Sequence, residues 1–190
     1  MAALFIGNNV RLKPLEGEED VRYLFRAFND QEVNGIYLHF EPKSWDEFQR
    51  SLKGSSGSVN KLCIFLIEKI DEKRIIGSIA HFVPNPYYNN FEIGYGIDRK
   101  EDRGKGYARE AVNLLIDYLF LTKNIERVQV TINADNLASQ KLIERCGFKN
   151  EGRLRNADYI NGNYSDVLIY GLLMPEWRSL RQLTASQVPT

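Results

Sequence analysis

The sequence predicts a single domain of the α/β class, in its α+β form, with a mixed, mostly antiparallel sheet of six or seven strands and about four helices. One observation is the order of the periodic segments, β-α-α-β-β-β-α-β-α-β-β. Another is composition: 190 residues with 43% hydrophobic side chains can form one substantial core, whereas two domains would each be small. We expect the domain to span residues 1–178, followed by a polar C-terminal tail at residues 179–190.

Apolar residues that alternate or run without interruption predict the strands, and apolar residues at helical spacing predict the helices. The run at 62–67 is nearly all apolar, which indicates a central strand covered on both faces. The strands are expected at residues 10–15, 62–67, 75–83, 91–97, 128–132, 148–154 and 166–173. The helices are expected at residues 20–29, 44–52, 106–121 and 136–146.

Short polar motifs mark the ends of these elements. Ser44, followed three residues later by Glu47, has the pattern of a capping box. Asn136 or Asp135 is expected as the N-cap of the fourth helix, and Gly147 as its C′ residue. The remaining turns are expected at residues 53–58, 71–74 and 161–163.

Charge and cysteine content exclude several classes of protein. Lys+Arg and Asp+Glu both total 25, so the chain lacks the global basic charge that drives nucleic-acid binding. Cys63 and Cys146 lie in apolar runs and are expected to be buried free thiols. There is no charged leader, and no run approaches the roughly 18 apolar residues of a membrane span. We therefore expect a cytoplasmic protein with no membrane or nucleic-acid partner.

The segment at 31–43 is irregular and rich in aromatic side chains. It can wall a pocket or pack within a helical hairpin, and the second interpretation is preferred because aromatic clusters are more often core. Neither His39 nor His81 has the spacing of a metal ligand, and position alone gives neither a catalytic role. We expect no metal site.

A basic, glycine-punctuated turn between the strand at 91–97 and the helix at 106–121 has the chemistry of an anion cradle. The first turn of a helix leaves N–H groups without acceptors and carries roughly half a positive charge. Gly104 and Gly106 have no Cβ to keep a phosphate from the backbone. An ordinary solvated basic turn is the alternative. The predicted cradle, which suits a pyrophosphate, consists of Arg103, Gly104, Lys105, Gly106, Tyr107 and Ala108.

The strand before the cradle alternates strictly. One face carries Glu92, Gly94 and Gly96, so a bare strip of backbone lies beside an ionisable group, as expected where a ligand lies against a strand. The alternative is a bulge or a bent edge strand with a solvated Glu92.

With these segments in this order, the chain up to Trp177 resembles the GCN5-related N-acetyltransferase superfamily. Arg103–Ala108 matches the family's (Gln/Arg)-x-x-Gly-x-(Gly/Ala) loop for the acetyl-CoA pyrophosphate, and Asn133–Ser139 with Cys146–Phe148 looks like the second cofactor segment. Polyamine acetyltransferases share much of this pattern. The motifs most similar to the ribosomal-protein N-terminal acetyltransferase branch are Asn136-x-x-Ser139, Gly147-Phe148, Glu151-Gly152 and Asn161-Gly162-x-Tyr164-x-Asp166.

The resemblance implies where acetyl-CoA, the co-substrate, is bound. The family splays a pair of parallel strands, here 91–97 and 128–132, and pantetheine lies along the first as a pseudo-strand. A backbone N–H near Ile97 polarises the thioester carbonyl. Asn136 and Ser139 complete the implied cofactor contacts, beside the cradle residues.

The resemblance also implies catalytic residues. Glu92 is expected to be the general base, because a carboxylate beside apolar walls gains proton affinity; attraction of a cationic amine is its alternative role. The family's usual tyrosine donor is replaced by Ile143. Ser139 is expected to hydrogen-bond the sulfur or relay a proton, with a bond to its own backbone as the alternative. Tyr95 and Tyr164 are further candidate donors, although Tyr95 faces away from Glu92.

The implied enzyme is an N-acetyltransferase that moves acetyl directly to a primary amine in a ternary complex. A protein N-terminal α-amine is the expected acceptor, and a polyamine or aminoglycoside-like amine is the alternative. A non-catalytic CoA-binding module is the third class. A homodimer is implied by the resemblance alone. The acids in the segment expected to wall the amine site, which favour polyamines weakly, are Glu32, Glu41, Asp46 and Glu47.

Overall fold

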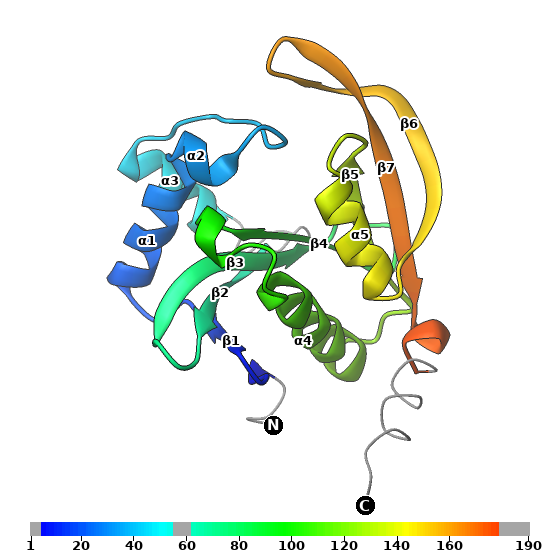
Figure 1. The fold of residues 1–190 in the computed structure, drawn as a ribbon, viewed down its shortest axis with the longest axis horizontal. Coiled ribbons are helices and arrows are strands. Elements are labelled where there is room, and N and C mark those ends of the chain that lie inside the picture. The colour runs from blue at the N-terminus through cyan, green and yellow to red at the C-terminus, as the bar shows by residue number, and fades with distance from the viewer. Residues whose placement is uncertain (1–4, 55–61, 179–190) are drawn as a thin grey trace, which may run out of the picture.

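A computed structural model describes residues 5–54 and 62–178. It contains a seven-stranded sheet in the order β1-β2-β3-β4-β5-β7-β6 (Figure 1). The strands are β1 (Val10–Pro14), β2 (Cys63–Lys69), β3 (Arg74–Phe82), β4 (Asn90–Ile97), β5 (Arg127–Asn133), β6 (Lys149–Ile160) and β7 (Asn163–Leu173). The helices are α1 (Glu18–Phe28), α2 (Gln31–Asn34), α3 (Trp45–Gly54), the 3₁₀ helix η2 (Lys100–Asp102), α4 (Tyr107–Thr122) and α5 (Leu137–Arg145). The predicted tail and most of the predicted turn at 53–58 lie outside the described residues.

The sheet is antiparallel except between β4 and β5. These two strands pair in parallel only at their beginnings, from Asn90↔Arg127 to Glu92↔Gln129. Both then continue without pairing to each other, β4 to Ile97 and β5 to Asn133. The predicted mixed sheet with a splayed parallel pair is confirmed. The splay leaves one edge of β4 free, which a regular sheet would not.

Helices cover both faces of the sheet. Helix α4 packs its buried side chains, such as Leu115 and Ile116, into a core with Ile93 and Ile97 of β4. On the opposite face, Leu66 of β2 packs with buried side chains of α1 and α3. Because Leu66 and its neighbours in β2 are buried, the prediction of a central strand covered on both faces is confirmed.

Two strands approach each other unusually closely at Gly77. This residue of β3 pairs with Ile97 at the end of β4. A Cβ added to Gly77 would lie 2.1 Å from the carbonyl oxygen of Gly96, which is far inside van der Waals contact. Only glycine fits there, so the position of the end of β4 depends on it.

The predicted caps are present. Ser44 and Glu47 form the capping box, with Ser44 N–H donating to Glu47 Oε2 at 2.9 Å and Glu47 N–H donating to Ser44 Oγ at 3.4 Å. Asn136 is the N-cap of α5 and Cys146 its C-cap, which leaves Gly147 at C′. The hairpin turn has positive φ at Asn161 and Gly162, as two-residue hairpin loops require.

Some elements differ from the prediction. Strand β6 runs to Ile160, whereas the sequence predicts an end at 154. Its second half is an exposed edge interrupted by a bulge, and it shows no apolar alternation from which a strand could be predicted. Helix α2, within the segment expected to be irregular, is four residues long, too short to show a period; Asp30 caps it. Within the described ranges, no helix is long and apolar enough to cross a membrane.

Candidate active site

The predicted cradle connects β4 to α4. After β4 the chain forms η2, turns, and begins α4 at Tyr107. Gly104 and Gly106 have φ of 74° and 87°, in the left-handed region that residues with a Cβ rarely adopt. An added Cβ at either position would meet no atom within 4 Å, so the backbone here is open to a ligand. The N–H groups of the first turn of α4 are available to an anion.

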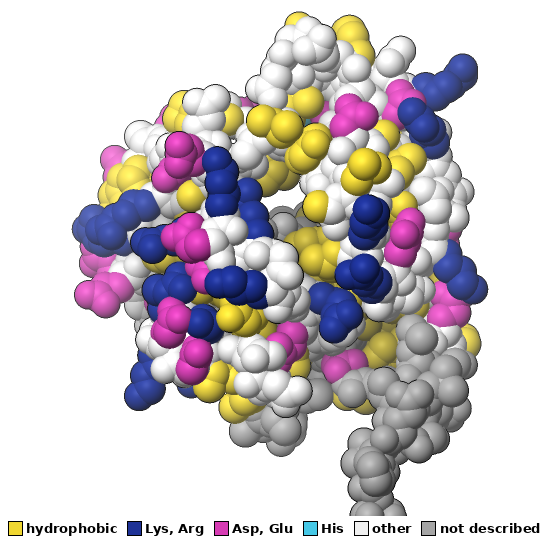
Figure 2. All heavy atoms as spheres, in the orientation of Figure 1, with side chains coloured by type: hydrophobic (Ala, Val, Ile, Leu, Met, Phe, Trp, Pro, Cys, Tyr) yellow, Lys and Arg dark blue, Asp and Glu magenta, His cyan; other side chains and the backbone are white. Residues whose placement is uncertain are grey.

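The two charged side chains of the cradle, Arg103 and Lys105, have different environments. Arg103 turns back, and its Nε and Nη2 donate to the carbonyl oxygens of Ile97 and Asp98, both at 2.8 Å. It therefore fastens the turn to the end of β4. Lys105 is exposed on the turn. Figure 2 shows Lys and Arg side chains on both sides of a hollow in the face that carries α4 and α5, which suits an anionic ligand.

An ion pair between a half-buried arginine and a buried aspartate holds η2 in front of the turn. Asp102 is 3% exposed, and its two carboxylate oxygens accept hydrogen bonds from Arg74 of β3 at 2.8 and 3.0 Å. The Arg74 guanidinium holds the pKa of the Asp102 carboxyl below its usual value. Sequence reasoning missed this support, because the two residues lie 28 positions apart and neither belongs to a motif.

The strand β4 has the predicted bare strip. Gly94 and Gly96 are exposed, and an added Cβ on either would meet nothing within 4 Å. The register between β3 and β4 has no shift, and β4 lies in the middle of the sheet, so the alternative of a bulge or bent edge strand is wrong.

Glu92 lies at the apex of the splay, where the pairing of β4 and β5 ends. Its Oε1 accepts a hydrogen bond from Thr131 Oγ1 at 2.6 Å and its Oε2 one from Gln129 Nε2 at 2.9 Å. Gln129 Oε1 in turn accepts from Asn90 Nδ2 at 2.8 Å. Side chains of β5 thus hold both carboxylate oxygens. Polar side chains therefore contact Glu92, besides the apolar walls expected of it.

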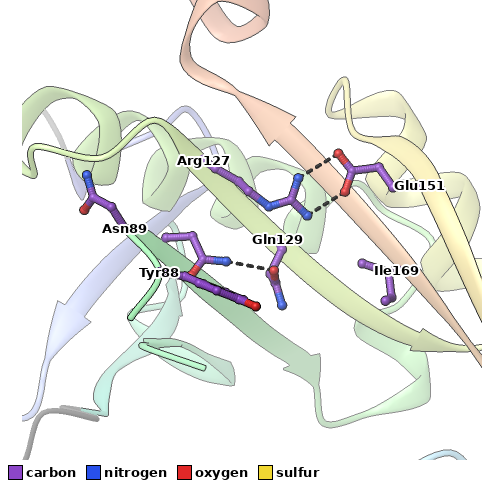
Figure 3. A pocket seen from close by; sticks show the side chains of 7 residues that line it. Tyr88, Asn89, Arg127, Gln129, Glu151 and Ile169 are labelled. Atoms are coloured by element: carbon purple, nitrogen blue, oxygen red, sulfur yellow. Dashed lines mark hydrogen bonds and ion pairs between the residues drawn. The ribbon is translucent and has the colours of Figure 1, made fainter. Parts of the chain in front are cut away.

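A cavity of about 520 Å³ adjoins this network at the paired end of the two strands (Figure 3). Gln129 lines the cavity and also holds Glu92. Arg127 and Glu151 form a bidentate ion pair along one wall, at 2.7 and 2.6 Å, and the exposed Tyr88 lines another part. Only the side chain of Gln129 therefore links the Glu92 carboxylate to the cavity, which is large enough for a small chemical group.

Ser139 and Tyr95 meet across the splay. Ser139 lies in the first turn of α5, where its N–H donates to Asn136 Oδ1 at 3.1 Å. Its Oγ is 2.7 Å from the hydroxyl oxygen of Tyr95, which comes from β4. Ile143, at the position of the family's usual tyrosine, is completely buried. The pattern of alternation predicted that Tyr95 faces away from Glu92, and did not predict its partner on α5.

The aromatic segment after α2 bridges the molecule. It meets the tip of the β6–β7 hairpin and the loop after β5, which lie on the far side of the splay (Figure 1). We call residues 35–43 and 158–164 together the arch. Its hydrogen bonds run from Asn161 Nδ2 to Ile36 O at 3.1 Å, between His39 Nε2 and Asp158 Oδ1 at 2.7 Å, and from the Tyr37 hydroxyl to Asp135 O at 3.1 Å.

The preferred interpretation of this segment was packing within a helical hairpin, and it is wrong for most of its length. Packing of that kind occurs at the end of the segment, where Lys43 Nζ lies over the Phe28 ring at 5.0 Å and the neighbouring Trp45 is edge-on to Phe25 at 5.2 Å. The arch instead exposes several large apolar side chains. They are Ile36, Leu38, Phe40, Tyr159 and Tyr164.

The four acids expected to wall an amine site do not converge. Glu47 is occupied by the Ser44 cap. Glu32 lines a separate cavity of about 740 Å³ between α1, β3 and η2, which also contains arginine and lysine side chains. Glu41 is an exposed loop residue, and Asp46 belongs to α3. Neither of them lines either cavity. No cluster of acids, histidines or cysteines that could hold a metal occurs among residues 5–54 and 62–178.

An anion cradle at the open end of a splayed parallel pair, with a carboxylate at its apex, defines an acyltransferase site. The sequence matches the family described as acetyltransferase (GNAT) domain over residues 9–149, and the chain belongs to this family. It is therefore an N-acetyltransferase with acetyl-CoA as its co-substrate, as the resemblance implied.

Relatives differ in their acceptors. A putative ribosomal N-acetyltransferase, YdaF of Bacillus subtilis, is 41% identical over 178 residues, which cover 90% of this chain and 95% of YdaF. The [ribosomal protein uS5]-alanine N-acetyltransferase of Escherichia coli is 34% identical over 109 residues, 56% of this chain and 55% of that one. A crystal structure of spermidine N-acetyltransferase from Vibrio cholerae with CoA and spermine has a TM-score of 0.77 at 26% identity, covering 90% of this chain and 99% of that one.

Proposed function

We propose that this protein acetylates the α-amine of a protein N-terminus. The observation that carries the proposal is the arch, which bridges the two halves of the molecule and exposes apolar side chains. The side chains of a peptide can bind to such an apolar surface, whereas recognition of a polyamine requires several carboxylates. Of the four acids that would favour a polyamine, only Glu41 belongs to the arch. The similarity to a putative ribosomal N-acetyltransferase agrees with this choice.

In this proposal the cradle, residues 103–108, holds the pyrophosphate of acetyl-CoA through backbone N–H groups and the charge of Lys105. Pantetheine lies along the free edge of β4, and the N–H near Ile97 polarises the thioester carbonyl. Asn136 contacts pantetheine in addition to capping α5. Glu92 accepts the proton that the amine loses, directly or through water, and its hydrogen bonds from Gln129 and Thr131 aim it.

The test is a thiol-release assay with acetyl-CoA and a panel of acceptors. We expect N-terminal peptides to give a kcat/KM at least tenfold above spermidine, spermine and aminoglycosides. Mass spectrometry of the product should place the acetyl group on the α-nitrogen, and a peptide with a blocked N-terminus but a free lysine is the matched control. Faster turnover of spermidine than of every peptide would favour the polyamine alternative, which the similarity to the Vibrio cholerae enzyme supports.

Three further properties are part of the proposal. Residues 1–178 form the whole catalytic domain, so removal of residues 179–190 should leave activity unchanged. A cytoplasmic location agrees with Cys63 and Cys146, which form no disulfide with each other, the second of them buried. A homodimer is expected from the family, and sedimentation equilibrium measures it.

A further inference from the structure

The free edge of β4 is bounded by two polar clusters. Glu92 and its partners lie at the apex of the splay. The pair of Tyr95 and Ser139 lies further toward the cradle, where β4 meets the first turn of α5. An extended ligand that runs from the cradle along this edge toward Glu92 meets the second cluster first. Among the side chains of the splay, Ser139 is therefore placed to meet a leaving group.

A serine hydroxyl has one proton, so its partners decide where that proton goes. Ser139 Oγ is 2.7 Å from the Tyr95 hydroxyl, and either oxygen can be the donor in this contact. If Ser139 donates to Tyr95, its proton is used and the ligand receives only lone pairs. If Tyr95 donates, the proton of Ser139 is left for the ligand.

The surroundings of Tyr95 favour the second arrangement. Burial raises the pKa of Tyr95 to about 12, so the phenol keeps its proton throughout the working range. A phenol is also the more acidic hydroxyl of the two, and hence the better donor. Asn136 fixes the backbone of Ser139 by accepting its N–H, which leaves the Oγ for Tyr95 and the ligand.

We propose that Tyr95 is a positioning residue, whose hydroxyl donates to Ser139 Oγ and so directs the single hydroxyl proton of Ser139 at the sulfur of the departing CoA. The inference rests on the proposed acetyl transfer. In that reaction the amine nitrogen bonds to the carbonyl carbon, the C–S bond breaks, and its electron pair stays on sulfur. The proton lost by nitrogen goes to Glu92, and the thiolate is held by the Ser139 hydrogen bond until it takes a proton from solvent. Tyr95 of β4, acting through Ser139, thereby compensates for the absence of a tyrosine at position 143.

The first test is kinetic, with the full-length protein, acetyl-CoA and the best peptide acceptor. We expect Ser139→Ala to lower kcat about 100-fold, as loss of a donor to developing negative charge does. Tyr95→Phe, which removes one oxygen, should lower kcat about tenfold with little change in the KM for acetyl-CoA. The double variant should be no slower than Ser139→Ala, because the two residues act through one proton.

Tyr170→Phe is the matched control. Tyr170 is 2% exposed, comes from β7, and donates to Glu144 Oε1 of α5 at 3.1 Å, so it too links a strand to this helix. It belongs neither to the Glu92 network nor to the Tyr95–Ser139 pair, so its substitution should leave kcat unchanged while lowering Tm about as much as Tyr95→Phe. A merely structural role for Tyr95 would make the two variants alike in kcat.

The second test needs no turnover and uses CoA itself as the probe. We expect the thiol of bound CoA to ionise at higher pH in Tyr95→Phe and in Ser139→Ala than in the wild type, by about one pH unit, a tenfold shift in thiolate fraction. Ultraviolet absorbance of the thiolate follows the titration, and Tyr170→Phe should titrate like the wild type.

An unshifted titration in Tyr95→Phe, or losses in kcat that multiply in the double variant, would overturn the inference. Failure of the proposed function is distinct, since a wild-type protein that acetylates no amine still reports the CoA titration. A wild type that acetylates peptides, beside a Tyr95→Phe variant of equal kcat, would contradict only the role of Tyr95.

Discussion

The cradle and the arch lie at different ends of the site and are built in different ways. The cradle is made of six consecutive residues, its proposed contacts to the ligand are mostly backbone N–H groups, and its shape follows from two glycines with positive φ. The arch is made of side chains from segments about 120 positions apart, joined by a few exposed hydrogen bonds. The first construction is local and leaves a motif in the sequence. The second leaves no motif and can change its ligand by changing a few side chains.

The strongest test of the cradle is Gly106→Asp. We expect acetyl-CoA binding to be lost, because the carboxylate adds bulk and negative charge where the pyrophosphate meets the backbone. Isothermal titration calorimetry measures it. Gly106→Ala is the control, with the same positive-φ strain and no charge, and should keep part of the affinity. Tight binding of acetyl-CoA by the aspartate variant would show that the cradle is not the site.

The second largest effect is expected at Glu92, at the apex of the splay between the cradle and the arch. Glu92→Gln should lower kcat about 100-fold or more near neutral pH and spare acetyl-CoA binding, since the base is lost and the cradle is not. The pH–rate profile should lose its dependence on the base. A profile that keeps the wild-type shape would remove the base assignment and leave Glu92 only the role of attracting the amine.

The support of the cradle is tested through stability. Arg74→Met should lower the free energy of unfolding by about 2 kcal/mol at pH 7, because it leaves the buried Asp102 carboxylate without its partner, while solvent at the one-third exposed Arg74 already screens part of the attraction. The pKa of Asp102 is lowered in the folded state, so the pair contributes stability above the unfolded pKa of about 3.9, and this is lost as the pH falls below that value. Denaturant titrations between pH 7 and 3 should therefore show wild type and variant converging in acid. Curves that stay parallel would contradict the role of the pair.

The smallest effect is expected at the arch. Asn161→Ala removes one exposed hydrogen bond to Ile36, worth about 1 kcal/mol, and should raise the KM for peptides about threefold to tenfold. Steady-state kinetics with the best peptide and with a small primary amine measure it, and turnover of the small amine should not change. An equal effect on both acceptors would mean that the arch does not contact the peptide.

Much of the fold could be predicted because it follows from local patterns. The alternation in β4 and the capping motifs at Ser44 and Asn136 depend only on neighbours in the sequence. The cradle could be predicted for the same reason. The second half of β6 could not, because an exposed edge strand buries no regular face and its pattern carries no signal.

The remaining parts of the site are contacts between distant residues. Gln129 and Thr131 hold Glu92 because β5 pairs in parallel with β4 at that point, and no local pattern encodes such a register. The partnership of Tyr95 with Ser139 is of the same kind. The polar partners of Glu92 could not be predicted, because the sequence of β4 alone shows its neighbours along the strand and not the side chains that β5 supplies.

The close approach of Gly77 to Gly96 has a consequence for mutational tolerance. Position 77 touches no proposed ligand, yet every side chain there would push the end of β4, and with it the start of the cradle, out of place. In a saturation library selected for activity, position 77 should therefore tolerate as few residues as a catalytic position does. A map of sensitive positions would mark it as functional, although its role is to give room to a neighbouring strand.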